Sequence, residues 1–236
     1  FLIGGAKMSS SKGTGSSAKD VSDSLPTKIL RLVLLSKKPM QAINFEPSGD
    51  TVPTLFDQYD KIAEDYWSAL ESDTVRLFEL VHGGTPPRER YYLPRFSIVA
   101  YLSQMPHITI EDEFAKLKGS PLNDVELTEL AERTSYAKKW LEENAPEKYI
   151  FNLQETLPEV AKDLSLKQKE ALSLLHDFLK ASTGVTGQDM HAKLHEIKEQ
   201  TNIEPKDFFT AIYLMLLGKE SGPKAGWFLS VLDQEM

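Results

Sequence analysis

The sequence contains no cysteine, which excludes disulfide scaffolds, cysteine nucleophiles, thiol redox chemistry and zinc sites with cysteine ligands. It also lacks any run of the ~18 consecutive apolar residues that a membrane-spanning helix needs, so we expect no membrane association. A basic surplus is missing as well, because 27 Lys and Arg stand against 35 Asp and Glu for a net charge of -8. General polyanion binders usually carry such a surplus, so the total charge argues against them, and we expect no DNA binding.

What the chain does have is length and an uneven charge. Its 236 residues leave room for one large domain or two modest ones. Residues 1–40 hold seven bases and two acids, a balance of +5, so the remaining 196 residues carry -13. The first residues, FLIGG, are typical of a buried strand that enters a loop. Since residue 1 is Phe and the segment is too short for a secretory signal, we expect the chain to begin inside a longer protein.

The spacing of apolar residues predicts a mainly α protein. Residues 26–36 fit a helix with Ser24 as its N-cap, residues 41–45 fit a short strand, and residues 55–70 fit a strong helix. The best internal break is HGGTPPRER at 82–90. Beyond the break we expect only helices, which are predicted at 94–104, 110–117, 121–144, 166–180, 187–200, 205–217 and about 223–234.

Several finer predictions concern these later helices. The pairs Thr109/Asp112 and Ser165/Gln168 are spaced as capping boxes, and Thr186 is placed to open the helix at 187–200. One apolar face is expected on the long helix, formed by Leu127, Leu130, Thr134, Ala137 and Leu141. On the helix at 187–200 we expect Met190, Leu194 and Ile197 to point inward.

The outstanding local feature is KMSSSKG at residues 7–13. Two ammonium groups, three hydroxyls and small residues that expose backbone N–H groups suit a phosphate chain. The same groups would stabilise charge that develops on phosphorus during a reaction. On composition alone, the favoured interpretation is a solvated, flexible terminal segment or a cloning remnant.

KMSSS resembles the KMSKS signature of the class I aminoacyl-tRNA synthetases. The segments that follow it resemble the class I lysyl-tRNA synthetases in particular, and the resemblance covers nearly the whole chain, with residues 71–120 the least distinctive. These segments are LPTKILRLVLL, KKPMQAINFEP, LFDQYDKIAEDYW, RTSYAKKWLEENAPEKYIFNL and FFTAIYLMLLGKESGPKAGWFLSVL. Glutamyl-tRNA synthetases share the loop and parts of the C-terminal ending, but the middle motifs fit the lysine enzymes better.

The resemblance implies that the loop closes over ATP, with Mg²⁺, in the full-length enzyme. Lys7, Met8, Ser9 and Ser11 match the signature, while Ser10 stands where the family usually has a phosphate-contacting lysine. The implied ATP-binding residues are therefore Lys7, Met8, Ser9, Ser10 and Ser11. The implied catalytic residues are Lys7, Ser10 and Lys12, with the phosphate-contacting lysine left open between Lys7 and Lys12.

The family's HIGH motif occurs nowhere in the chain. We therefore expect this fragment neither to activate lysine by itself nor to hold ATP. The resemblance further implies that residues 1–70 finish the catalytic side and contact the inner corner of tRNA. Residues 71–236 would form an all-α anticodon-binding domain of a monomeric, cytoplasmic enzyme.

The long helix at 121–144 offers a physical candidate for RNA contact. Arg133, Tyr136 and Trp140 share one stripe, where aromatic rings beside a guanidinium could stack an unpaired base. The alternative is that Tyr136 and Trp140 pack on a neighbouring helix and that Arg133 pairs with a nearby Glu. Candidate phosphate contacts are Lys138, Lys139 and Lys148, with Lys219 and Lys224 beside the Gly-Pro turn as a second set. For Lys219 and Lys224, ordinary solvated lysines are the favoured interpretation.

No metal site is expected. His191 and His195 are four residues apart on a predicted helix, but they border its apolar face and fit half-buried structural histidines better than metal ligands.

Three functions remain open from the sequence. The first is the tRNA-binding C-terminal part of a class I lysine–tRNA ligase. The second is a stand-alone helical module that binds another protein, and the third is a fragment of a glutamyl-tRNA synthetase-like enzyme.

Overall fold

The computed structural model describes residues 2–3, 6–7, 18–38, 40–41, 44–45, 48–69, 72–105, 108–154, 156–182 and 184–232. The chain divides into two compact units. Unit 1 comprises Phe1–Ser103 with Ile108–Pro146, and unit 2 comprises Gln104–His107 with Glu147–Met236. The boundary predicted near residue 70 separates two functional regions, residues 1–70 and residues 71–236. A division of the chain by its packing does not test that boundary, so it stays a prediction.

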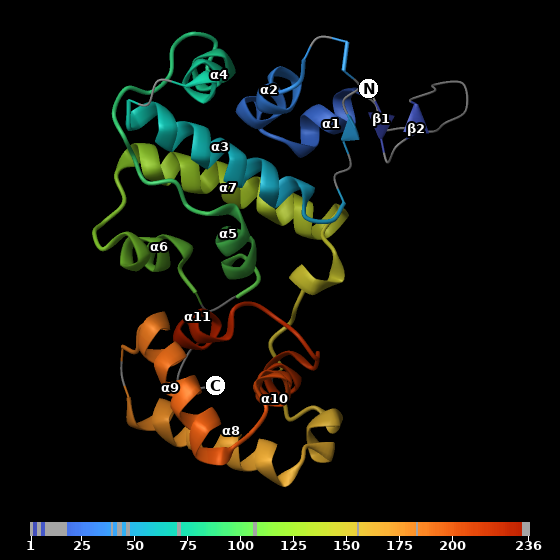
Figure 1. Cartoon of the computed structure of the whole chain (residues 1–236), viewed down its shortest axis with the longest axis vertical. Helices are drawn as coiled ribbons and strands as arrows, with labels where there is room; N and C mark the ends of the chain where they lie inside the picture. The colour runs from blue at the N-terminus through green and yellow to red at the C-terminus, as the bar shows by residue number, and fades with distance from the viewer. Residues whose placement is uncertain are drawn as a thin grey trace. The chain divides into compact units, whose positions relative to one another are not determined.

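Unit 1 carries a small sheet and seven helices among its described residues (Figure 1). Strand β1 (Leu2–Ile3) pairs antiparallel with β2 (Ala6–Lys7) and parallel with β3 (Asn44–Phe45), which gives the order β2-β1-β3. The strand predicted at the N-terminus is confirmed as β1, and the strand predicted at 41–45 is confirmed for residues 44–45. The helices are α1 (Ala18–Ser24), α2 (Thr27–Leu35), α3 (Thr51–Trp67), α4 (Asp73–Val81), α5 (Phe96–Leu102), α6 (Ile110–Lys118) and α7 (Asp124–Glu143).

Aromatic side chains build the core of unit 1. Phe56 of α3 stacks on Phe96 of α5 with ring centroids 4.2 Å apart, and Phe96 meets Trp140 of α7 edge to face at 5.8 Å. A second cluster surrounds the fully buried Phe78 of α4, which Tyr59 and other α3 rings contact. These contacts fix α3 against α4 and α5.

Two details of unit 1 differ from the sequence-based expectations. Ser24 does not cap α2; it is the last residue of the separate helix α1, and Pro26 occupies the N-cap of α2. On α7, Leu127 is 38% exposed, whereas Glu126, Glu129 and Arg133 are buried beside Leu130 and Ala137. The predicted apolar face is therefore wrong in part, because ion pairs allow charged side chains to occupy the inner face.

Helices are the regular secondary structure of unit 2 among its described residues. It contains two 3₁₀ turns, η2 (Glu147–Tyr149) and η3 (Glu159–Asp163), and the helices α8 (Leu166–Ala181), α9 (Gly187–Thr201), α10 (Pro205–Leu217) and α11 (Ala225–Ser230). Met190, Leu194 and Ile197 of α9 are buried as predicted. The prediction of a mainly α protein is confirmed, and among the described residues no helix is long and apolar enough to cross a membrane.

Capping chemistry explains where several helices begin. Ser165 with Gln168 and Thr186 with Asp189 form capping boxes, in which each side chain bonds the other residue's backbone N–H. Asn123 and Glu126 form a third box that sequence inspection missed. Thr109 precedes α6, but its side chain makes no capping hydrogen bond, so that predicted box is wrong.

Candidate nucleic-acid interface

The predicted ATP loop follows the short sheet of unit 1. Lys7 is the last residue of β2 and lies opposite Leu2 of β1, and helix α1 begins at Ala18. Met8, Ser9, Ser10, Ser11 and Lys12 lie outside the described residues. Their assigned roles, and that of Lys7, therefore stay predictions.

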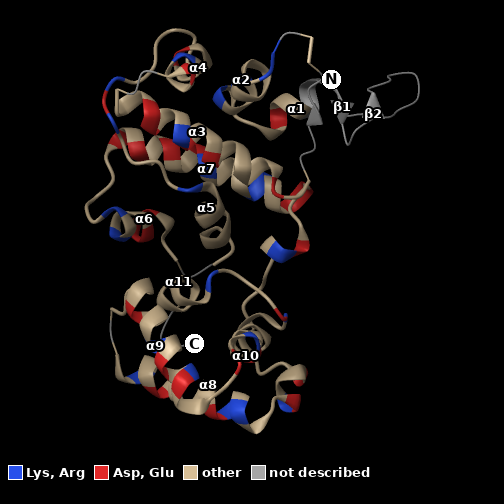
Figure 2. Ribbon diagram, viewed as in Figure 1, with Lys and Arg blue, Asp and Glu red and all other residues tan. Residues whose placement is uncertain are grey.

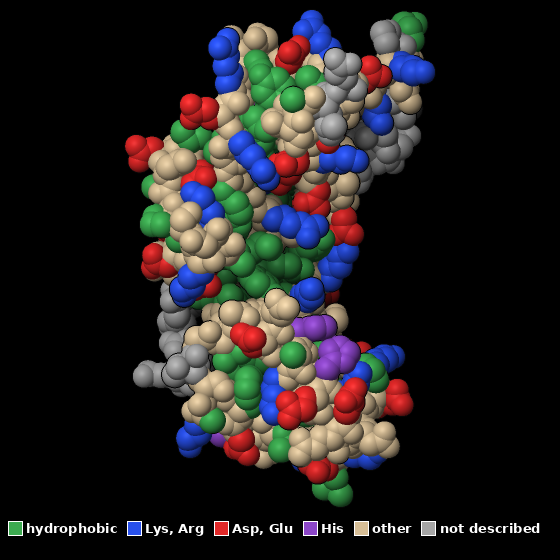
Figure 3. Space-filling model, turned by 60° about the vertical axis from the view of Figure 1, so that its left-hand side comes forward, with side chains coloured by type: hydrophobic (Ala, Val, Ile, Leu, Met, Phe, Trp, Pro, Cys, Tyr) green, Lys and Arg blue, Asp and Glu red, His purple; other side chains and the backbone are tan. Residues whose placement is uncertain are grey.

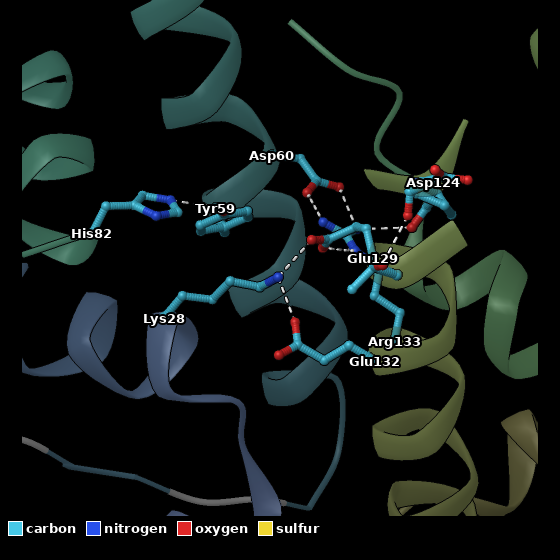
Figure 4. A network of polar contacts seen from close by, with 10 residues as sticks. Lys28, Tyr59, Asp60, His82, Asp124, Glu129, Glu132 and Arg133 are labelled. Atoms are coloured by element: carbon cyan, nitrogen blue, oxygen red, sulfur yellow. Dashed lines mark hydrogen bonds and ion pairs between the residues drawn. The ribbon is translucent and has the colours of Figure 1, made fainter. Parts of the chain in front are cut away.

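Arg133 is the centre of a buried polar network that joins α7 to α3 (Figure 4). Its side chain is completely buried, and its Nε donates to Glu129 Oε1 at 2.7 Å. Its Nη1 donates both to Asp60 Oδ2 at 3.0 Å and to the backbone oxygen of Pro94 at 2.7 Å, and its Nη2 donates to Asp60 Oδ1. The guanidinium also lies 5.2 Å from the ring centroid of Phe56. Every face of this cation is thus occupied by the protein.

Lys28 extends the same network to α2. Its Nζ lies 2.6 Å from Glu129 Oε2, contacts the carboxylate of Glu132, and sits 5.4 Å from the centre of the Tyr59 ring. Tyr59 in turn shares a hydrogen bond of 3.0 Å with Nε2 of His82, which follows α4. The network therefore joins α2, α3, the end of α4 and α7 within unit 1.

The charges of Lys28, Glu129 and Arg133 support one another, whereas burial raises the pKa of Asp60 in spite of its pairing with Arg133. Burial by itself would raise the pKa of Glu129, but Arg133 and Lys28 outweigh it, so that the pKa is lowered. Burial would likewise lower the pKa of Arg133, and the carboxylates of Asp60 and Glu129 raise it instead. The pKa of His82 is lowered, first by burial and then by the positive charge of Lys28. Glu129 is therefore ionised and His82 neutral near pH 7.

The stripe proposed for base stacking on α7 is only partly exposed. Arg133 is fully buried, and Trp140 retains 2% of its surface beside Phe96. These two residues match the alternative given in the sequence analysis, because Trp140 packs on Phe96 of a neighbouring helix and Arg133 pairs with Glu129. Tyr136 is half-buried, so a contact through its ring stays a prediction.

Figure 2 shows how Lys and Arg are distributed along the described chain. The lysines predicted to touch phosphate differ in their surroundings. Lys138, Lys148 and Lys224 are exposed. Lys139 donates to the backbone oxygen of Asp23 at 3.1 Å, which links α7 to α1. Lys219 in unit 2 donates to the oxygen of Ile150 at 2.9 Å and pairs with Glu147, so it already holds the η2 segment. Phosphate contact by all five stays a prediction.

The two histidines of α9 do not form a metal site with other described residues. His191 and His195 are exposed rather than half-buried, with ring centroids 4.8 Å apart. Lys198 Nζ lies 3.2 Å from Nδ1 of His195. Within the described part of the chain, no group of three or more His, Asp or Glu side chains is placed to hold a metal ion.

Sequence reasoning offered a nearby Glu as an alternative partner of Arg133, but it missed Asp60 and the link through Glu129 to Lys28. Glu129 stands four residues before Arg133 on the same helix, a spacing that could have indicated their ion pair. Asp60 and Lys28 are 73 and 101 residues away from their partners, and no local pattern connects them.

The two helical units and the basic segment at residues 1–40 define a class of helical protein. Comparison with known families identifies this class. The chain belongs to the family described as "Anticodon binding domain", which matches residues 106–236. Residues 1–84 match a second family, described as "tRNA synthetases class I (K)". The resemblance to class I lysyl-tRNA synthetases is thereby confirmed over both parts of the chain.

The similar individual proteins are lysine–tRNA ligases. That of Methanocaldococcus jannaschii is 29% identical over 246 residues, which cover 97% of this chain and 46% of the relative. The enzyme of Methanosarcina barkeri is 28% identical over 97% of this chain and 45% of its own length. The enzyme of Borreliella burgdorferi is 28% identical over 97% of this chain and 44% of its own length. The chain thus spans a little less than half the length of these relatives.

Proposed function

We propose that the chain is the tRNA-binding part of a class I lysine–tRNA ligase. The observation that carries the proposal is the order of the two family matches, a class I synthetase segment followed by an anticodon-binding domain in one chain. The helical unit 2 and the exposed lysines on α7 and before α11 agree with an RNA-binding role. The protein acts as a cytoplasmic monomer, and its partner is tRNA rather than DNA or a membrane.

The N-terminal loop has a second role in this proposal. Lys7, Ser10 and Lys12, with Met8, Ser9 and Ser11, contact ATP, which carries Mg²⁺, when the nucleotide-binding half of the enzyme is present. Because the chain spans less than half of its relatives, lysine activation belongs to the longer protein. The chain by itself binds tRNA without forming the lysyl adenylate.

Filter binding at low salt tests the tRNA-binding role. The chain is titrated with a lysine tRNA, with the same tRNA carrying an altered anticodon, and with an unrelated tRNA. We expect the lysine tRNA to bind most tightly. For all three RNAs, the logarithm of the association constant should fall linearly with the logarithm of the salt concentration. Equal affinity for the three RNAs would remove the claim that the chain recognises the anticodon.

The loop is tested in a protein extended N-terminally to the length of the relatives. Lysine-dependent pyrophosphate exchange is measured for Lys7→Ala, Ser10→Ala and Lys12→Ala. If Lys7 alone contacts the phosphates, only the first variant loses activity strongly, by about 100-fold for one lost transition-state contact. A comparable loss in Lys12→Ala would assign the phosphate contact to Lys12. Unchanged exchange in all three would remove the ATP role of the loop.

A further inference from the structure

A hollow of about 470 Å³ lies in unit 1 between α3, the segment at residues 90–93, the end of α6 and the first turn of α7. Three aromatic side chains, Trp67, Tyr91 and Tyr92, line it together with Arg90, Glu64 and Lys118. Its volume falls within the range of pockets that hold small organic ligands. None of the roles assigned so far uses this pocket. One face of the molecule, with hydrophobic, basic and acidic side chains interspersed, is shown in Figure 3.

The aromatic wall of the hollow is held in place by the protein. Trp67 Nε1 donates to the backbone oxygen of Pro87 at 3.0 Å, and the Trp67 ring meets Tyr91 edge to face at 5.0 Å. The backbone N–H of Tyr92 donates to Glu126 Oε1 at 2.9 Å, and its ring packs on Phe114. Rings fixed in this way need little reordering when a flat ligand stacks on them.

The charged groups indicate what kind of flat ligand fits. Glu126 accepts from Lys118 and from two backbone N–H groups, and Asp60 is engaged by Arg133, so both deeper carboxylates are already neutralised. The lining as a whole holds three carboxylates against two cations, and this net negative charge disfavours a phosphate. At the edge, Arg90 and Glu64 are 69% and 48% exposed and form a pair of 3.1 Å. Such an exposed pair contributes little stability, so both groups are available to a ligand.

We propose that this pocket, formed by Trp67, Tyr91, Tyr92, Arg90 and Glu64, binds one unpaired nucleobase of RNA. The base stacks on an aromatic ring, Arg90 donates hydrogen bonds to its acceptors, and Glu64 accepts from a ring or exocyclic N–H. Single-stranded RNA is commonly recognised through this combination of stacking and edge hydrogen bonds. The identification of RNA as the ligand rests on the proposed function, whereas the fit to a base rests on the pocket.

Two variants and two matched controls test the pocket. Tyr91→Leu removes the aromatic face and Arg90→Ala removes the guanidinium. Tyr91→Phe keeps the ring, and Arg76→Ala removes an arginine that is 70% exposed and paired with Glu79 on α4, outside the pocket. Circular dichroism and melting curves verify that each variant folds. We expect Kd for the lysine tRNA to rise about tenfold in Tyr91→Leu, as for the loss of one base–aromatic stack, and less than twofold in the controls.

A second probe separates the pocket from tRNA recognition. A mixed-sequence hexaribonucleotide is titrated while tryptophan fluorescence is recorded, and stacking beside Trp67 should quench it in the wild type but not in Trp67→Phe. If the hexamer binds in this way while all tRNAs bind equally, the claim that the chain recognises the anticodon is wrong and the pocket stands. If lysine tRNA is preferred but Tyr91→Leu and Arg90→Ala bind it as well as the wild type, the pocket proposal is overturned.

Discussion

At the scale of single residues, Arg133 carries the largest expected effect on stability. Arg133→Met would leave the carboxylates of Asp60 and Glu129 without their buried cation. Breaking a buried pair by removing one partner typically costs about 3–5 kcal/mol, so we expect a loss of that size in the free energy of unfolding. Urea denaturation followed by circular dichroism measures it.

The control is Arg95→Met, which removes an arginine that is 61% exposed and paired with Asp57. An exposed pair contributes about 0–1 kcal/mol, so this variant should unfold almost like the wild type. Equal losses in the two variants would contradict the view that the buried network holds α7. Binding of tRNA by Arg133→Met near that of the wild type, at a temperature where it is folded, would agree with the burial of its guanidinium.

His82 gives unit 1 a dependence on pH at the residue scale. Its folded-state pKa lies below the ordinary value of 6.5, because burial and the charge of Lys28 disfavour its protonation. The unfolded chain therefore binds a proton first as the pH falls, and the free energy of unfolding decreases below about pH 6.5. His82→Gln should show a shallower fall between about pH 7 and 5. The free energy of unfolding is measured by denaturant titration at each pH for the wild type and the variant. If the two proteins lose stability in parallel as the pH falls, His82 does not contribute to the pH dependence.

At the scale of elements, the contact between α9 and α11 depends on a glycine. A Cβ at position 226 would lie 3.0 Å from the oxygen of Gly187 and 3.2 Å from the Cβ of His191. Gly226→Ala should therefore push the helices apart and lower the free energy of unfolding by about 1–3 kcal/mol, as overpacked cores do. Chemical denaturation measures the loss.

Gly187→Ala is the matched control on the opposite side of this contact. A Cβ there would lie 3.4 Å from the Cα of Trp227, an ordinary contact distance. Since alanine favours a helix over glycine, this variant should be as stable as the wild type or slightly more stable. A loss as large as that of Gly226→Ala would mean that the close approach is not what limits position 226.

Elements were predictable where their ends carry a local signal. The helix predicted at 205–217 is α10, which begins at Pro205 and ends before Gly218 with φ +64°. The capping box of α8 and the place of Thr186 before α9 were predicted for the same reason. The inner face of α7 was not, because Glu129 and Arg133 can be buried only next to Asp60 and Lys28. The proposed base pocket was also missed, since packing alone brings Trp67, Tyr91 and Lys118 together.

At the scale of the whole molecule, the family matches and the compact units divide the chain differently. The anticodon-binding match begins at residue 106, yet α6 and α7 within it belong to unit 1. The ion pair between Lys28 and Glu129 joins a residue of one matched region to a residue of the other. A cut between the two regions would therefore break buried charge pairs, and we expect neither matched region to be the unit that folds by itself.

The two compact units should instead unfold separately, which calorimetry of the whole chain tests. Each unit has its own buried core, so we expect two transitions rather than one. Arg133→Met should lower the melting temperature of one transition by roughly 10 °C and leave the other in place, because a unit of about 140 residues loses about 2–4 °C per kcal/mol. Gly226→Ala should lower only the other transition. A single transition that both variants shift would mean that the chain unfolds as one cooperative body, and that the charge network and the α9–α11 contact stabilise the same structure.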